Sequence, residues 1–172
     1  KIVILGWSEA SDSSINYGYA NWVNASGVSL GTGYNIRTWD NRLDASQAYF
    51  NNGSLLGTFG VDQLVGGKYA DVIAAYNGDD TLVGRGGNDT LTGGDGADRF
   101  VIGRYANTTD QITDLQAWEY GDTIDLGEFA DIQHFADVKQ RMSQQGGDTV
   151  ISLGDNQVLI LQGINKDNLG RV

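Results

Sequence analysis

The chain of 172 residues contains no cysteine, no proline and a single histidine, His134. Without cysteine it can form no disulfide, no thiolate metal site and no Cys-His catalytic pair. We interpret His134 as a surface or packing residue, and one histidine argues against a Ser-His-Asp site and most zinc sites. The carboxylates single out no acid and base pair, and no phosphate-binding loop is present. The sequence therefore predicts a module that is not an enzyme, whatever its parent protein does.

Long hydrophobic runs are also missing, so we expect no signal peptide and no insertion into a membrane. Because the chain begins at Lys1 and carries no signal peptide, we expect it to be a fragment of a larger protein. We also expect the module to be monomeric. A chain without cysteine suits a protein that is exported unfolded and stabilised outside the cell by metal instead of disulfides.

Basic residues are few, with 11 Lys and Arg against 22 Asp and Glu, which gives a net charge of −11. Residues 1–59 hold four acids and three bases, whereas residues 60–172 hold eighteen acids and eight bases. Such a surface repels nucleic acids and anionic membranes, so neither is an expected partner. Bound cations would offset the excess of acid in the second part of the chain.

Glycine is abundant, with 25 residues, and it recurs in a nine-residue pattern between Gly60 and Val101. In register, the stretch reads GVDQLV, GGKYADVIA, AYNGDDTLV, GRGGNDTLT and GGDGADRFV. The sixth place holds Asp62, Asp71, Asp80, Asp89 and Asp98. The eighth place holds Leu64, Ile73, Leu82, Leu91 and Phe100. A flexible linker does not keep an apolar residue at every ninth position, so the pattern indicates a repeat structure.

Each unit divides into a turn and a short strand. Segments such as Thr90-Leu91-Thr92 point the middle residue to one side and its neighbours to the other, as a strand does. The glycines before them allow the chain to reverse direction. Each unit is thus half a coil, and the pattern predicts an all-β, right-handed parallel β-roll with coils of eighteen residues. One sheet then contributes Leu64, Leu82 and Phe100 to the core, and the other contributes Ile73 and Leu91.

The same winding stacks the aspartates into two columns, one of Asp62, Asp80 and Asp98 and one of Asp71 and Asp89. Like charges on neighbouring strands are destabilising, so each stacked pair needs a cation. Calcium fits, because it takes six to eight oxygen ligands at roughly 2.3–2.6 Å and accepts both carboxylates and backbone carbonyls. We expect about three or more ions. Further oxygen donors are the side chains of Asn77 and Asp95 and the carbonyls of the turns at Gly78, Gly87 and Gly96.

The pattern G-G-x-G-x-D-x-U-x resembles the calcium-binding nonapeptide of RTX proteins. The likeness extends beyond the repeats, because Ile112-Thr113-Asp114-Leu115 and Gly121-Asp122-Thr123-Ile124-Asp125-Leu126 are similar to the segment after the roll in type I-secreted proteins. That family usually has Phe where this chain has Leu115. The resemblance implies a further calcium held by Asp110, Asp114, Asp122 and Asp125; ordinary capping of turns by aspartate is the alternative.

Residues 1–59 differ in composition and hold nine of the seventeen aromatic residues. The segments Leu43–Ser46 and Leu55–Gly57 read as degenerate repeats, so the roll is able to begin before Gly60. Two interpretations of the aromatic residues stay open: a cap on the first coil, or a platform for a glycan or peptide ligand. The residues expected to form such a platform are Trp7, Tyr17, Tyr19, Trp22 and Trp39.

Residues 104–172 are expected to cap the other end of the roll. Phe135, Val138 and Met142 have helical spacing before Gly146-Gly147, which predicts one short amphipathic helix. Thr149–Leu153 and Gln157–Leu161 predict a β-hairpin. The chain thus divides into an N-terminal cap or ligand-binding extension (1–59), the roll (60–103) and a C-terminal capping region (104–172).

Two functional classes are consistent with this organisation. One is a calcium-stabilised module of a secreted or cell-surface adhesin, exported by type I secretion as the RTX resemblance implies, in which residues 1–59 recognise a ligand. The other is the C-terminal folding, secretion or substrate-binding module of an exoenzyme, such as a protease, a lipase or an alginate epimerase.

Overall fold

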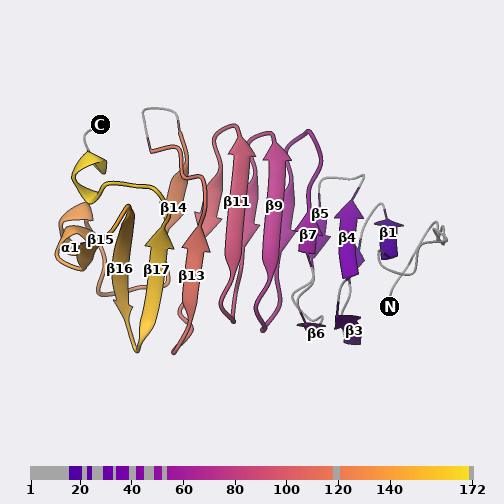
Figure 1. Ribbon diagram of the computed structural model, residues 1–172, viewed down its shortest axis with the longest axis horizontal. Helices are drawn as coiled ribbons and strands as arrows, with labels where there is room; N and C mark the ends of the chain where they lie inside the picture. The colour runs from indigo at the N-terminus through magenta and orange to yellow at the C-terminus, as the bar shows by residue number, and fades with distance from the viewer. Residues whose placement is uncertain are drawn as a thin grey trace.

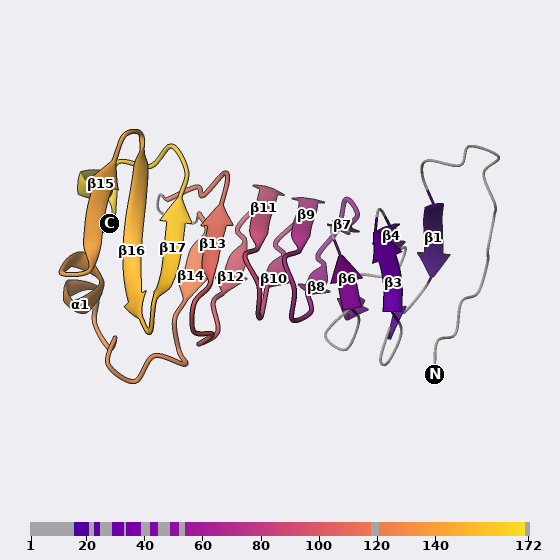
Figure 2. The same cartoon turned by 60° about the horizontal axis from the view of Figure 1, so that its bottom comes forward.

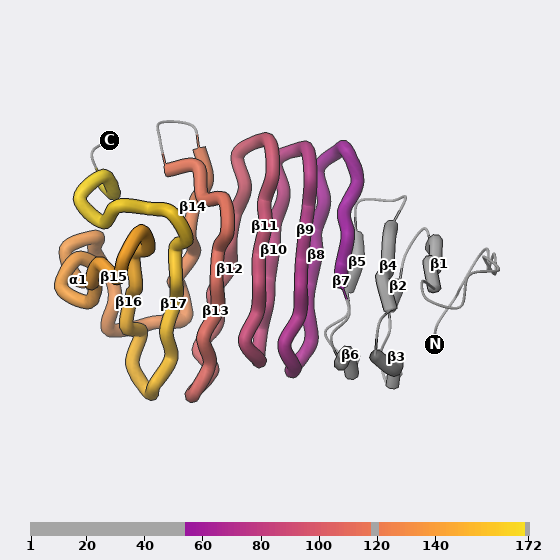
Figure 3. Tube along the Cα trace, viewed as in Figure 1, coloured from indigo at the N-terminus to yellow at the C-terminus, as the bar shows by residue number. Residues whose placement is uncertain are grey.

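The computed structural model describes residues 54–117 and 121–170 in full and, before them, the backbone of strands β1 to β6. The chain winds between two sheets whose strands stack along the long axis of the molecule (Figures 1 and 3). A nine-stranded sheet has the order β1 (Asn16–Ala20), β4 (Tyr34–Thr38), β7 (Ser54–Leu56), β9 (Val72–Asn77), β11 (Thr90–Asp95), β13 (Thr109–Ile112), β17 (Gln157–Leu161), β16 (Asp148–Gly154) and β15 (Met142–Gln145). A six-stranded sheet has the order β14 (Thr123–Asp125), β12 (Arg99–Val101), β10 (Thr81–Val83), β8 (Gln63–Val65), β5 (Arg42–Asp44) and β2 (Val23–Asn24). The fold is a parallel β-roll, as the repeat predicts.

The eighth place of the repeat forms the core. Leu82 pairs in register with Leu64 on one side and with Phe100 on the other, and all three side chains are fully buried. In the other sheet Leu91 pairs with Ile73, again with full burial. Both sets of apolar residues predicted to face inward are therefore confirmed. Burying each of these side chains stabilises the fold by about 1.5–3 kcal/mol.

The sheets continue before Gly60. Strand β7 pairs with β9 through Leu55 and Ile73, and β5 pairs with β8 through Leu43 and Leu64, so the degenerate repeats do join the roll. A third, two-stranded sheet of β3 (Ser29–Thr32) and β6 (Tyr49–Asn51) lies beside these first coils (Figure 1). The side chains of residues 1–53, among them the proposed ligand residues Trp7, Tyr17, Tyr19, Trp22 and Trp39, lie outside the described residues.

An antiparallel unit follows the last coil (Figure 2). Strand β17 pairs in parallel with β13 and antiparallel with β16, and β16 pairs antiparallel with β15. The predicted hairpin is confirmed, and its turn places Asp155 and Asn156 at φ 50° and 57°, as a type I′ turn requires. The 3₁₀-helix η1 (Lys166–Asn168) follows it.

The predicted helix is present but shorter than its apolar spacing suggests. Helix α1 (Phe135–Lys139) has five residues, and Met142 instead begins strand β15 opposite Ile151. A helix this short has little stability of its own. The backbone hydrogen bonds that strand β15 forms with β16 therefore decide the conformation of Met142. Within the described residues, no helix is long and apolar enough to cross a membrane.

Candidate metal centre

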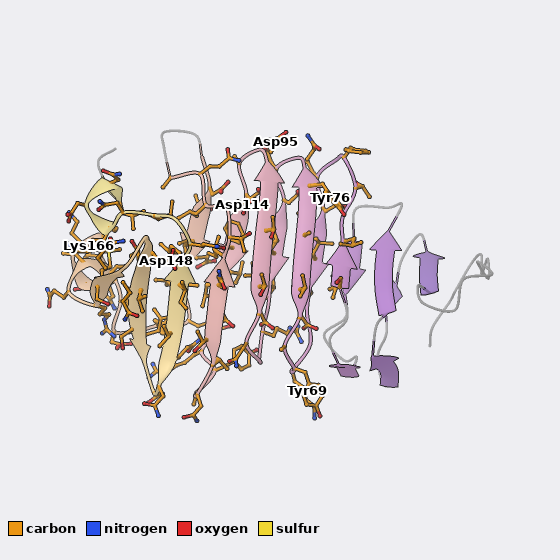
Figure 4. The ribbon with its side chains drawn as sticks, viewed as in Figure 1. Tyr69, Tyr76, Asp95, Asp114, Asp148 and Lys166 are labelled. Atoms are coloured by element: carbon orange, nitrogen blue, oxygen red, sulfur yellow. The ribbon has the colours of Figure 1, made fainter. Side chains whose placement is uncertain are left out.

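The aspartates at the sixth place of the repeat lie at two opposite edges of the roll. We call these the Asp80 edge, with the turns 57–62, 75–80 and 93–98, and the Asp89 edge, with the turns 66–71, 84–89 and 103–110. Figure 4 labels Tyr76 and Asp95 at the first edge and Tyr69 at the second. All five repeat aspartates are buried, with 1–2 % of their surface exposed.

Each column is linked by hydrogen bonds from backbone to carboxylate. The N–H of Asp62 donates to Oδ1 of Asp80 at 2.7 Å, and the N–H of Asp80 donates to Oδ1 of Asp98 at 2.9 Å. At the other edge the N–H of Asp71 donates to Oδ1 of Asp89 at 2.9 Å. Every coil thus offers a carboxylate to the backbone of the coil before it.

The columns extend one coil beyond the regular repeat. The N–H of Asp89 donates to Oδ1 of Asp110 at 3.1 Å, and the N–H of Asp98 donates to Oδ1 of Asp122 at 2.9 Å. These steps span 21 and 24 residues instead of 18. A fixed period of nine misses both positions. The signal that identifies them is a short strand, because Asp110 lies at the start of β13 and Asp122 directly precedes β14.

The first carboxylates of the two columns accept from their own turns instead, Asp62 from the N–H of Thr58 and Asp71 from the N–H of Gly67. Every repeat carboxylate still has one oxygen without a partner. Five buried atoms within the described residues accept no hydrogen bond: Asp62 Oδ1, Asp71 Oδ1, Asp80 Oδ2, Asp89 Oδ2 and Asp98 Oδ2. A buried polar atom without a partner costs about 1–3 kcal/mol, and a charged one costs more. The same defect at every aspartate of a repeat points to one ligand that all of them share.

Three successive turns have the same backbone geometry. Their second and fourth places adopt left-handed φ angles: Tyr76 (81°), Gly78 (124°), Arg85 (71°), Gly87 (121°), Gly94 (105°) and Gly96 (136°). On the Asp80 edge, the turns 75–80 and 93–98 are stacked in close contact. A Cβ on Gly94 would overlap the carbonyl oxygen of Tyr76, and a Cβ on Gly96 would overlap the carbonyl oxygen of Gly78. Backbone carbonyl oxygens therefore lie between the stacked turns, near the buried carboxylates.

A family model for the RTX calcium-binding nonapeptide repeat, in four copies, matches residues 56–91 and 75–104 of the chain. Residues 56–104 form an RTX calcium-binding domain. The match covers the turns described above and the strands between them, and no curated protein matches the chain.

The RTX turns suit calcium better than they suit a metal whose protein ligands are all side chains. In the described part of the chain, no three His, Cys, Asp or Glu side chains form a group that could hold a metal ion. Most of the six to eight oxygens around a calcium ion would therefore come from backbone carbonyls, which the stacked turns supply. The unpaired oxygens of Asp80 and Asp98 are the carboxylate ligands expected between the turns 75–80 and 93–98.

Burial raises the pKa of four RTX aspartates. It raises the pKa of Asp71, Asp80 and Asp98 to about 6, against hydrogen bonds to backbone N–H groups that lower these values. Burial, together with the neighbouring carboxylates of Asp110 and Asp71, raises the pKa of Asp89 to about 8, against the hydrogen bond from the N–H of Asp71 that lowers it. Without a cation, keeping these buried carboxylates charged costs free energy. Bound calcium would remove this cost.

Asn77 and Asp95 lie on the outer side of the Asp80 edge. The Nδ2 of Asn77 donates to Oδ2 of Asp95 at 3.2 Å, and Oδ1 of Asp79 accepts the N–H of Ala97 at 2.9 Å. Oxygens of Asn77 and Asp95 thus stand beside the stacked turns, at the third place of the repeat. Their role as further ligands of calcium, like that of the carbonyls at Gly78, Gly87 and Gly96, stays a prediction.

The aspartates after the repeats make different contacts. Both oxygens of Asp114 accept backbone N–H groups, from Gly93 at 3.0 Å and Gly94 at 2.8 Å. Asp122 accepts from Asp98 and, at 2.7 Å, from Gln116. Asp125 pairs with Arg99 and accepts the N–H of Gly127 at 2.8 Å. These contacts favour capping of the last RTX turn, and the further calcium that the resemblance implied for Asp110, Asp114, Asp122 and Asp125 stays a prediction.

Proposed function

We propose that the chain is a calcium-dependent folding module of a protein secreted by a type I system. The unpaired oxygen on each of the five buried repeat carboxylates is the observation that carries this proposal. Calcium between stacked turns satisfies these oxygens and joins neighbouring coils, so binding and folding form one process.

The calcium concentration then decides where the module folds. Extracellular calcium modules work with dissociation constants of about 10⁻⁴–10⁻³ M, close to the concentration outside cells. In the calcium-poor cytosol the aspartate columns lack their cations, and the chain stays unfolded and suitable for export. Outside the cell it folds without any disulfide, which matches the absence of cysteine.

Circular dichroism of the metal-free chain, followed by a calcium titration, tests this function. We expect a largely disordered spectrum in EGTA and a β-sheet signal that grows with calcium. Magnesium is the control, because it requires a smaller octahedral site and holds its waters tightly. Identical spectra in EGTA and in calcium would refute the proposal.

A role for residues 1–59 in binding a glycan or peptide, as part of an adhesin, rests on their sequence alone. Aromatic side chains beside Asn and Ser suit stacking on a neutral sugar at about 1 kcal/mol per contact. Glycan-array binding in calcium, repeated with Trp22→Ala and Trp39→Ala, distinguishes this role from a cap. Loss of binding with an unchanged melting temperature supports the adhesin, whereas a lower melting temperature without any binding supports the folding and secretion module of an exoenzyme.

A further inference from the structure

The Asp89 edge carries a hollow of about 500 Å³ with an unusual charge. Three cationic side chains line it, those of Lys68, Arg85 and Arg104, and among the described residues no carboxylate does. The chain as a whole has a net charge of −11. We call this feature the basic hollow. It lies on the edge that carries Tyr69, opposite the edge that carries Asp95 (Figure 4).

The basic hollow exists because its floor has no side chain. Gly86 and Gly87 form part of its lining. A Cβ on Gly86 would lie 3.3 Å from the ring of Tyr105 and 3.6 Å from the backbone of Lys68. Any larger residue at position 86 would therefore project between these two walls. Gly86 is not in the left-handed region, so space and not backbone conformation accounts for this glycine.

Arg85 occupies a place that the RTX repeat normally gives to glycine. Its backbone has φ 71°, which is unfavourable for a residue with a long side chain. Its side chain is half-buried, and no carboxylate of the described residues lies within ion-pair distance of its guanidinium. The chain thus holds an unpaired cation in a strained conformation at the wall of a hollow.

The other groups of the wall differ in their contacts. Arg104 pairs with Asp155 at 2.9 Å and lies 3.6 Å from Asp131, so its charge is largely offset. The Nζ of Lys68 lies 4.9 Å from the centre of the Tyr69 ring. Tyr69 and Tyr105 are 41 % and 37 % exposed. Cations and exposed aromatic rings therefore occur together around the basic hollow.

We propose that the basic hollow binds one acidic sugar ring, with its carboxylate or sulfate near Arg85 and Lys68 and the ring of Tyr105 against the sugar. Its volume lies in the range of small-molecule sites, about 300–1,000 Å³, and exceeds what a single inorganic anion fills. Arginine binds planar carboxylates and sulfates through two parallel hydrogen bonds, and tyrosine offers an apolar face with a polar tip. A nucleic acid duplex is disfavoured, because its many phosphates would meet an acidic surface around three cations.

The site depends on the roll, and its described lining contains no residue from positions 54–59. Its walls come from three stacked segments of the Asp89 edge, so binding requires the folded, calcium-bound chain. Circular dichroism in the same buffer establishes folding independently of sugar binding. A failure of calcium-linked folding is thereby distinguished from a failure of the basic hollow.

Calorimetry on the full chain in calcium tests the proposal with three probes. These are a sulfated disaccharide that contains glucuronate, the neutral disaccharide cellobiose, and inorganic sulfate. We expect the sulfated disaccharide to bind at least tenfold more tightly than either of the others. Equal binding of sulfate and the acidic disaccharide would reduce the hollow to a simple anion site and overturn the proposal, as would equal binding of cellobiose.

Two variants of the wall and floor and one matched control locate the site. Arg85→Gly removes the cation and relieves the left-handed strain, so we expect at least fivefold weaker binding together with a melting temperature that is unchanged or about 2–4 °C higher. Gly86→Gln fills the hollow without changing its charge and should weaken binding as much. Tyr76→Gly relieves the same strain at the same repeat position of the Asp80 edge, and should leave binding unchanged. Wild-type affinity in either Arg85→Gly or Gly86→Gln would overturn the proposal.

Discussion

The backbone N–H of Asp80 donates to Oδ1 of Asp98 at 2.9 Å, while Oδ2 of Asp98 is buried without a partner. One carboxylate oxygen therefore joins two coils of the protein, and the other is left for a ligand. The same division recurs at Asp80 and at Asp89. It explains how a column of aspartates can both hold the backbone of the roll and bind calcium.

Removal of Asp80 should affect calcium binding more than removal of Asp62. Asp80 lies between two neighbours of its column, whereas Asp62 accepts from Thr58 of its own turn. We expect Asp80→Ala to lower the number of bound ions, or the cooperativity of binding, more than Asp62→Ala in calorimetric titrations. Asp167→Ala is a control, because Asp167 is exposed and lies in the 3₁₀-helix η1, outside both columns. Equal losses in the Asp80 and Asp62 variants would mean that the ions are not shared between coils.

The Asp71 and Asp89 pair should bind calcium more weakly than the Asp80 and Asp98 pair. Tyr69 stands where the repeat expects glycine, and the turn 66–71 lacks the left-handed residues of the turns 75–80 and 93–98. Calcium must also displace a proton at Asp89, whose pKa burial raises to about 8. We expect Asp98→Asn to raise the calcium concentration at the folding midpoint several-fold more than Asp89→Asn. The reverse order would show that the Asp89 edge holds the stronger site.

The metal-free roll should become more stable as the pH falls from 8 to 5. Burial raises the pKa of Asp71, Asp80, Asp98 and Asp89 above the unfolded value of about 3.9, so the folded state binds more protons than the unfolded state in this range. Their contribution to stability is complete below the unfolded pKa and is lost as the pH rises through 6 to 8. The β-sheet signal of dialysed, metal-free protein in circular dichroism, followed from pH 8 to pH 5, measures this effect as a gain of folded chain.

Asp89→Asn provides the control for that pH dependence. It keeps the oxygen that accepts the N–H of Asp71 but removes the group with the highest pKa of the four. The dependence between pH 7 and pH 8 should become shallower in this variant. A wild-type, metal-free β-sheet signal that rises with pH over the same range would contradict the pKa values of the buried carboxylates.

Gly94→Ala should destabilise the roll more than Gly154→Ala. Both glycines have left-handed backbones, with φ 105° and 96°, so both substitutions carry a backbone strain of about 1–3 kcal/mol. Only at Gly94 would the new Cβ overlap a carbonyl oxygen, that of Tyr76, whereas nothing lies within 4 Å at Gly154. Urea unfolding in calcium measures the difference. Equal costs would show that the turns are not packed against each other by their backbones.

The structure of the roll could be predicted well from the repeat, because an apolar residue recurs at one fixed place of every unit and has the same role in each. An apolar residue at every ninth place requires a core between two sheets, and Leu82 stacks between Leu64 and Phe100 as that spacing implies. Asp110 and Asp122 could not be placed in the same way, because longer connections precede them and the period fails. Met142 was wrongly predicted to lie in the helix. The helical spacing of Phe135, Val138 and Met142 cannot reveal that strand β16 pairs with Met142 instead.

The basic hollow had no sequence signal of its own. Lys68, Arg85 and Arg104 come from three segments and follow no common spacing. They meet only because the turns stack, with the N–H of Gly86 donating to the carbonyl of Gly67 at 3.2 Å. In the sequence, Arg85 looks like a plain departure from the glycine of the repeat.

Calcium anomalous scattering from crystals of the full chain tests the central claim most directly. The claim is that the unpaired carboxylate oxygens are ligands of calcium between stacked turns. We predict an anomalous peak between the turns 75–80 and 93–98, within about 2.3–2.6 Å of Oδ2 of Asp80 or Asp98. A calcium-grown crystal in which these oxygens have no calcium neighbour, while the roll is intact, would contradict it.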